Sequence, residues 1–398
     1  MIGGPAASPP GSPVPLERVT ALDGLRGFAA CIVVAFHYLY LLYPATVPPH
    51  VAPNLAWLAD TPFGILWNGR FAVSVFFVLS GFVIAGAADR RREWIVVSVI
   101  ARYLRLAVPV LMSVLLAWVL LTLLPSASLN LVQAVDDPSP WASGTHQGDI
   151  PSLRYAVADG LFYNFIHGGS QFNNVLWTMQ IELIGSVGIF LLYAAARGWL
   201  RVVLLVLVGL AIVLIGWLPS AYLTFALGAL LYEAHIRGWL RVLPPVLPLF
   251  SLLAGLSLGA PGPGAAERLY LDGMPFLRGI GARQSSATSF AAALILFSIL
   301  ALPSLQRPIS GRISRWLGRI SFSLYLVHVP LLYTVVAFAF VNFPIHPLLL
   351  ATLYAAVTLA LAHAFTVAVD ERALTFLGRF RALFRPPARP IIPSRQAS

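Results

Sequence analysis

Two residues in the first apolar segment could take part in chemistry. The stretch "LDGLRGFAACIVVAFHY" runs from Leu22 to Tyr38 and carries Arg26 near its start and His37 near its end. In a helix these two side chains would be three turns apart, on one face and about 16 Å apart along the axis. A guanidinium binds anions such as phosphate, and an imidazole can accept a proton at neutral pH. Asp23 lies one turn before Arg26, where a carboxylate could pair with it.

A pair of arginines occurs in "ARYLRL". Arg102 and Arg105 are three residues apart, so they project from the same side of a helix. Two neighbouring guanidiniums suit phosphate groups, because each offers planar, bidentate donors. Arginines beside an apolar run also mark its cytoplasmic end, and the spacing leaves both interpretations open.

Several polar residues lie inside other apolar runs, where they are costly and often functional. Glu182 lies in "NNVLWTMQIELIGS" and needs a cationic partner, hydrogen bonds or a proton. His328 is in the middle of "ISFSLYLVHVPLLY". Ser80 could line a cavity, although Ser-Gly also permits close helix packing. Trp177 is typical of a membrane interface.

The elements that must position these residues are transmembrane helices. The chain has 398 residues, of which 59% are hydrophobic and 10% are charged, whereas soluble domains carry about 25% charged residues. The sequence therefore predicts an all-α polytopic membrane protein and excludes an ordinary soluble one. It has ten apolar runs, at 27–43, 70–87, 106–124, 175–196, 202–218, 220–234, 243–260, 288–303, 320–341 and 346–369.

The arginines predict the orientation of these runs. All 26 basic residues are arginine, and the net charge is +11. With the N-terminus inside, every inner segment is basic, and most of the arginines fall there, which places both termini in the cytoplasm. In a membrane protein such a surplus indicates cytoplasmic loops and contact with anionic lipids rather than with nucleic acid.

The same pattern predicts the domain organisation. Residues 1–20 form a disordered N-terminal tail, 21–369 a ten-helix membrane domain and 370–398 a basic cytoplasmic tail. Two long segments, 125–174 and 261–287, are expected outside.

Five motifs, in order, resemble those of the membrane-bound acyltransferase 3 family. They are "LDGLRGFAACIVVAFHY", "VFFVLSGFVIA", "ARYLRL", "LWTMQIELIGS" and "SFSLYLVHVPLL", and the resemblance extends from about Arg18 to Val369. That family transfers acetyl or other short acyl groups from cytoplasmic acyl-coenzyme A to hydroxyls, sometimes amines, of sugars and related acceptors. Its core has ten helices.

The resemblance implies a role for each candidate residue. His37 would be the general base, and Arg26 would stabilise charge on the donor or on the thioester oxyanion. Arg102 and Arg105 would hold the phosphates of acyl-coenzyme A, with acetyl-coenzyme A the expected donor. Glu182 or His328 would orient the acceptor or tune His37. Further substrate contacts are expected from Asp23, Ser80, Trp177 and Tyr325. No metal site is expected, because the histidines are scattered without ligand spacing.

Two departures from the family pattern matter. The sequence predicts a member without the appended periplasmic hydrolase-like domain of some relatives, which favours direct transfer to the acceptor or a small or lipid-linked acceptor. It also has "TMQI" where many members have a serine-rich stretch. The expected location is the bacterial cytoplasmic membrane.

A different class of function is also consistent with these residues. A proton-coupled transporter or flippase could use the same glutamate and histidines as a proton relay. It would need inverted repeats and broken helices at matching positions, and only the run at 243–260, which contains Pro244, Pro245 and Pro248, looks broken. A non-catalytic membrane scaffold would leave the buried charges unexplained.

Overall fold

The structure is a computed structural model, and it describes residues 20–47, 61–91, 93–143, 146, 148–215, 220–260 and 283–384. Within these ranges every element of regular secondary structure is helical. The first part of the chain contains α1 (Thr20–Leu42), η1 (Pro44–Thr46), η2 (Pro62–Trp67), α3 (Gly69–Asp89) and α4 (Ile95–Leu123). The following segment contains α5 (Ala127–Ala134), α6 (Pro140–Ser143), α7 (Leu153–Ala158), η3 (Asp159–Tyr163), α8 (Asn164–His167) and η4 (Asn174–Leu176).

The second half of the described chain is also helical. The next helices are α9 (Trp177–Ala195), α10 (Trp199–Ile215), α11 (Ala221–Ile236), η5 (Trp239–Val242), α12 (Val246–Leu258), α14 (Arg283–Ala301) and α15 (Pro303–Gln306). The last are α16 (Arg312–Leu331), η7 (Leu332–Val336), α17 (Ala337–Asn342), α18 (Pro347–Phe365), η8 (Thr366–Asp370) and α19 (Glu371–Leu383).

Length and composition identify the helices that can cross a membrane. Six helical stretches qualify: 20–42, 69–89, 95–123, 174–195, 312–342 and 347–383. Four shorter apolar helices, at 199–214, 221–236, 246–258 and 287–301, accompany them. Each of the ten predicted runs coincides with one of these helices. The chain is therefore a multi-pass integral membrane protein, while the count of ten crossings and the side of each terminus stay predictions.

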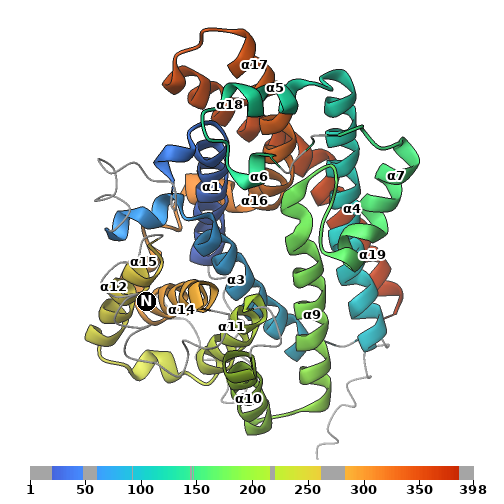
Figure 1. Cartoon of the computed structure of the whole chain (residues 1–398). Helices are drawn as coiled ribbons and strands as arrows, with labels where there is room; N and C mark the ends of the chain where they lie inside the picture. Colours follow the sequence, from blue (N-terminus) through green and yellow to red (C-terminus); the bar gives the residue numbers. More distant parts are fainter. Residues whose placement is uncertain are drawn as a thin grey trace, which may run out of the picture.

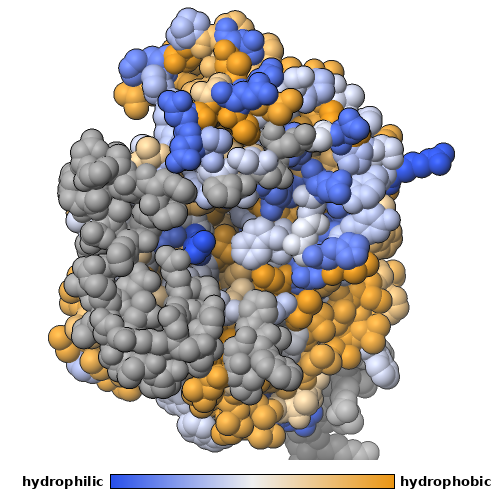
Figure 2. Space-filling model, viewed as in Figure 1, coloured by the Kyte–Doolittle hydropathy of each residue, from blue (hydrophilic) through white to orange (hydrophobic). Residues whose placement is uncertain are grey.

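The surface agrees with a membrane location. Figure 2 shows hydrophobic side chains over the lower part of the molecule, where α9 lies in Figure 1, and hydrophilic ones above them. Along α9 the exposed apolar residues are Trp177, Ile184 and Leu191, which lie seven residues apart and so share one face of the helix. That face suits lipid.

The two helices that carry the deep histidines run parallel and close together. A Cβ on Gly27 of α1 would lie 2.6 Å from Leu317 Cβ of α16, and one on Gly318 would lie 2.2 Å from the Asp23 carbonyl oxygen. Glycine permits this approach, as small residues do between membrane helices. Ten residues further along each helix are His37 and His328, so the crossing sets their register.

Several helices begin earlier than their apolar runs. The structure starts α4 at Ile95 rather than at 106, so Arg102 and Arg105 lie inside the helix and not before it. Likewise α1 starts at Thr20 and includes Asp23 and Arg26. These charges do not end the helices, because they line a pocket inside the bundle.

Parts of five predicted segments lie outside the described residues. They are 1–19 of the expected N-terminal tail, 144–145 and 147 of the first outer segment, 216–218 of the run at 202–218, 261–282 of the second outer segment and 385–398 of the expected C-terminal tail. The described part of the C-terminal tail forms α19, which packs against α4.

Candidate functional site

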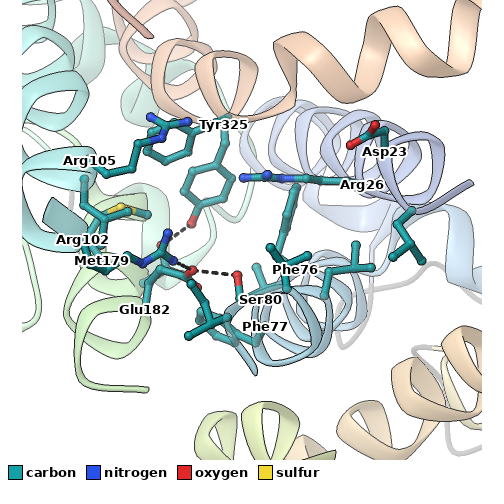
Figure 3. A pocket seen from close by; sticks show the side chains of 18 residues that line it. Asp23, Arg26, Phe76, Phe77, Ser80, Arg102, Arg105, Met179, Glu182 and Tyr325 are labelled. Carbon is teal, nitrogen blue, oxygen red and sulfur yellow. Dashed lines mark hydrogen bonds and ion pairs between the residues drawn. The ribbon is translucent and has the colours of Figure 1, made fainter. Parts of the chain in front are cut away.

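Five helices enclose a charged pocket. Residues of α1, α3, α4, α9 and α16 line this cavity of about 180 Å³. Its walls are largely apolar, but five charged side chains enter it: Asp23, Arg26, Arg102, Arg105 and Glu182. Figure 3 shows them converging on the same space. We call this cavity the arginine pocket.

The Glu182 carboxylate is held by two residues from neighbouring helices. Its Oε1 pairs with Arg102 Nη2 and accepts a hydrogen bond of 2.6 Å from Ser80 Oγ. Arg102 Nε in turn donates to Ser186 Oγ at 2.9 Å. Of the three alternatives that the sequence left open for Glu182, the structure shows a cationic partner, Arg102, together with a hydrogen bond from Ser80. In such surroundings the removal of one partner of an ion pair costs about 3–5 kcal/mol.

Arg105 is also paired with a carboxylate. Its Nη1 contacts Asp370 Oδ1, and Nη2 donates to Asp370 Oδ2 at 3.1 Å. The two-pronged geometry matches the guanidinium fork to the carboxylate. The Arg105 guanidinium also lies 5.1 Å from the ring centroid of Phe322. Asp370 ends the π-helical turn η8, which therefore links α18 to the arginine pocket.

Arg26 differs from the other two arginines. It makes no hydrogen bond or salt bridge with another residue that the structure describes, and its guanidinium reaches into the arginine pocket toward Tyr325 (Figure 3). The other charged side chains that line the pocket with it are Asp23, Arg102, Arg105 and Glu182. Arg26 is thus the arginine whose donors are ready to receive an anion.

His37 and His328 form a hydrogen-bonded pair, and the surrounding carbonyls fix their protons. His328 Nδ1 lies 2.8 Å from Tyr325 O and 3.1 Å from Leu324 O. Because carbonyl oxygens only accept, Nδ1 carries the proton and Nε2 is left as an acceptor. That Nε2 is 3.1 Å from His37 Nδ1, which also lies 2.9 Å from Val33 O, so His37 Nδ1 is protonated too.

These hydrogen bonds leave the lone pair of His37 Nε2 available. His37 Nε2 is the unprotonated nitrogen of the His37 ring, and unlike His328 Nε2 it has no hydrogen-bond partner among the described residues. The pair is set in aromatic surroundings, since the His37 ring lies 4.7 Å from Trp141 and 5.1 Å from Phe36 between centroids. Among the candidate residues, His37 therefore has the geometry of a proton acceptor.

Tyr325 lies between the histidine pair and the arginine pocket. It lines the pocket, and its ring centroid is 5.8 Å from that of His328. Its hydroxyl donates to Val175 O at 2.8 Å and lies 2.9 Å from Thr178 Oγ1, which fixes it against α9. The two sites are therefore neighbours along α1 and α16, separated by one aromatic ring.

The structure brings most of the predicted site residues together. Asp23, Ser80 and Tyr325 line the arginine pocket with the charged residues. Trp177 does not line it: its side chain is 43% exposed on the outside of α9. Its role as a substrate contact stays a prediction.

Three neighbours of the site were not predicted. Asp370 and Ser186 hold Arg105 and Arg102, and Trp141 lies against His37. A signal for Asp370 was present, since it is a carboxylate at the basic end of the last apolar run. Nothing in the sequence singled out Ser186 or Trp141.

Most of the chain is similar to one known protein domain. A family model described as an acyltransferase domain matches residues 19–367. No curated protein and no solved structure shows significant similarity. Among the described residues, no group of three His, Cys, Asp or Glu side chains is placed to hold a metal ion.

Proposed function

The chain belongs to the acyltransferase 3 family, and on that basis we propose that it transfers a short acyl group from cytoplasmic acyl-coenzyme A to a hydroxyl group. Acetyl is the expected acyl group, and the acceptor is a sugar, a glycan or a small molecule. The proposed location is a bacterial cytoplasmic membrane. The donor would enter the arginine pocket from the inner side, and the acceptor would approach His37 from the other side.

The unpaired Nε2 of His37 is the observation that supports this proposal best. His328 directs the proton of His37 to Nδ1, at 3.1 Å, and leaves Nε2 as the base. A positioned general base contributes about 10²–10⁴ in rate. Since His37 and Arg26 share one face of α1, the base and the anion-binding group lie along one line through the bundle.

The proposed reaction moves the acyl group directly from the thioester to the acceptor hydroxyl. His37 Nε2 takes the proton of the acceptor hydroxyl while the hydroxyl oxygen bonds to the thioester carbonyl carbon. The carbon–sulfur bond then breaks, the thiolate of coenzyme A leaves, and the imidazolium returns a proton to that sulfur. The products are an ester and free coenzyme A.

The phosphates of the donor suit the arginine pocket. Among the described residues Arg26 has no hydrogen-bond or ion-pair partner, whereas Arg102 and Arg105 are held by Glu182 and Asp370. A phosphate would bind first at Arg26, by charge-assisted hydrogen bonds. The narrow arm that carries the thioester would then pass Tyr325 toward His37.

Acyl transfer can be measured directly. Purified protein in detergent, given labelled acetyl-coenzyme A and a panel of hydroxyl acceptors, is expected to produce labelled ester. His37→Gln should abolish this product and still bind the donor, because the arginine pocket is untouched. His235→Gln is the control, since His235 packs on Phe82 and does not line the arginine pocket. Normal transfer by His37→Gln would exclude His37 as the base.

The donor site needs a separate test. Arg26→Ala should raise the KM for acetyl-coenzyme A by about tenfold or more, the usual effect of losing a hydrogen bond to a charged group. Arg319→Ala is the matched control, because Arg319 is a half-exposed arginine paired with Glu371. Equal donor KM values for both variants would exclude Arg26 from donor binding.

A further inference from the structure

A proline interrupts the helix that carries His328. Pro330 lies inside α16, two residues after His328. Proline has no backbone N–H, so the carbonyl oxygen four residues earlier loses its helical hydrogen bond, and the proline ring crowds that carbonyl. In α16 this carbonyl belongs to Leu326, which is fully buried. A buried carbonyl oxygen needs a donor, so the donor must come from outside the helical ladder.

Two side chains from other parts of the chain donate to the Leu326 carbonyl oxygen. Ser113 Oγ of α4 donates to it at 2.8 Å. Asn173 Nδ2, from the residue before η4, donates to it at 2.9 Å and to Ser113 Oγ at 3.0 Å. Both side chains are 0% exposed. We call Ser113, Asn173 and the Leu326 carbonyl the Leu326 clamp.

The orientation of the Asn173 amide shows which contact it serves. Its NH₂ group has two N–H donors, and these are used by the Leu326 carbonyl and by Ser113. Its Oδ1 is buried and has no hydrogen-bond partner among the described residues. The reverse orientation would turn Oδ1 toward the carbonyl oxygen, and two acceptors cannot bond to each other. The amide therefore satisfies Leu326 although one of its own atoms stays unpaired, which is unfavourable.

The Leu326 clamp lies next to the carbonyls that orient His328. Nδ1 of His328 is held by the carbonyl oxygens of Leu324 and Tyr325, the two residues directly before Leu326. A shift of the backbone at Leu326 would therefore carry the His328 ring with it. His328 Nε2 is 3.1 Å from His37 Nδ1. Since a contact of about 3.6 Å is no longer a hydrogen bond, a shift of about 0.5 Å is enough to break this one.

We propose that Ser113 and Asn173 are positioning residues for the histidine pair. By holding the Leu326 carbonyl they keep His328 within hydrogen-bonding distance of His37, and so keep the proton of His37 on Nδ1. Neither residue touches the reacting atoms. This inference rests on the proposed acyl transfer, in which His37 Nε2 is the base, and it adds two residues of α4 and the segment before α9 on which that base depends.

Pro330 provides a background in which the clamp is not needed. In Pro330→Ala, residue 330 regains an N–H that can bond to the Leu326 carbonyl oxygen within the helix. Asn173→Leu removes the amide donors and keeps a side chain of similar size. In the wild-type background it should lower kcat between about twofold and about tenfold, the effect of one neutral hydrogen bond. In the Pro330→Ala background the same substitution should change kcat by less than about twofold.

The measurements are kcat and the donor KM for labelled acetyl-coenzyme A in detergent, at saturating acceptor. The donor KM should stay unchanged in Asn173→Leu, because Asn173 does not line the arginine pocket. Ser113→Ala should also lower kcat and should also be suppressed by Pro330→Ala. Ser298→Ala is the matched control and should keep the wild-type kcat. Ser298 is likewise 0% exposed and donates to a carbonyl oxygen, that of Leu294 at 2.7 Å, but within α14.

Thermal midpoints of the same variants test the clamp without reference to activity. In a double-mutant cycle, Asn173→Leu should lower the midpoint less in the Pro330→Ala background than in the wild type. Should Asn173→Leu fail to fold, Ser113→Ala makes the same comparison in both backgrounds.

The outcomes separate this inference from the function on which it rests. A kcat loss that is equal in the two backgrounds, or a fall in the midpoint without any loss of kcat, would overturn the positioning role and leave acyl transfer standing. No turnover of acetyl-coenzyme A by the wild type with any acceptor would overturn both.

Discussion

Replacing His37 by glutamine should slow acyl transfer far more than replacing His328 by glutamine. In the proposed mechanism His37 Nε2 takes the acceptor proton, and His37→Gln removes that nitrogen, so we expect the rate to fall by about 10²–10⁴. His328→Gln keeps an oxygen near the former Nε2 position, where it can accept the hydrogen bond from His37 Nδ1. The 3.1 Å hydrogen bond from His37 Nδ1 would then be weaker but not lost. A neutral hydrogen bond contributes about 0.5–1.5 kcal/mol, so the loss should be between about twofold and about tenfold.

The assay is the initial rate of labelled acyl transfer at saturating donor, with the best acceptor of the panel. A third variant, His328→Leu, fills much of the same buried space without an acceptor and should be slower than His328→Gln. Donor binding and the thermal midpoint in detergent show that each variant is folded. If His328→Gln loses as much activity as His37→Gln, the proton is not taken by His37 alone. If His37→Gln stays near the wild-type rate, the tautomer reasoning is wrong.

Three further predictions concern stability and topology. Gly81→Ala should lower the thermal midpoint, because its Cβ would lie 2.3 Å from the Phe225 carbonyl oxygen, an overpacking that costs about 1–3 kcal/mol; Gly188→Ala, with open space, should not. Burial raises the pKa of Asp159 from 3.8 to about 6. Its contribution to stability is therefore full below pH 4 and lost as the pH rises through 6, by up to about 3 kcal/mol. The midpoint of the wild type relative to Asp159→Asn should fall over this range, and a constant difference would contradict it. Impermeant thiol reagents should label single cysteines in 125–174 but not in 304–319 of intact cells, and the reverse would invert the predicted orientation.

The helices of the bundle could be predicted because lipid requires long apolar segments, and those segments are visible in one sequence. Their starts were less predictable. The apolar run at 106–124 put Arg102 and Arg105 at the inner start of a helix, yet α4 extends well before both and begins at Ile95. Their charges are neutralised by carboxylates on other helices, so they impose no boundary. Apolar content along the chain cannot reveal such neutralisation.

The site was partly predictable for a related reason. Arg26 and His37 lie on one helix, so the spacing alone puts them on one face. The partners of the other arginines are far along the chain: Glu182 is 80 residues from Arg102, and Asp370 is 265 residues from Arg105. Helix neighbours at such separations depend on packing that a single sequence does not specify. The tautomer of His37 likewise depends on His328, 291 residues away.

The ion pairs of the arginine pocket also bear on which anions it would accept. A small anion with one charge would find Arg26 open but could reach Arg102 or Arg105 only by displacing Glu182 or Asp370. A displaced Glu182 or Asp370 would be left as an unpaired carboxylate in apolar surroundings. The single new contact between the anion and the arginine would not offset the ion pair that is lost. A donor with several phosphates can bind Arg26 first and then compete for Arg105 as part of the same molecule, at a high effective concentration. The paired arginines would thus disfavour free phosphate or acetate and favour a polyanion such as acyl-coenzyme A. Glu182 and Asp370 would contribute to this selectivity without touching the reacting atoms.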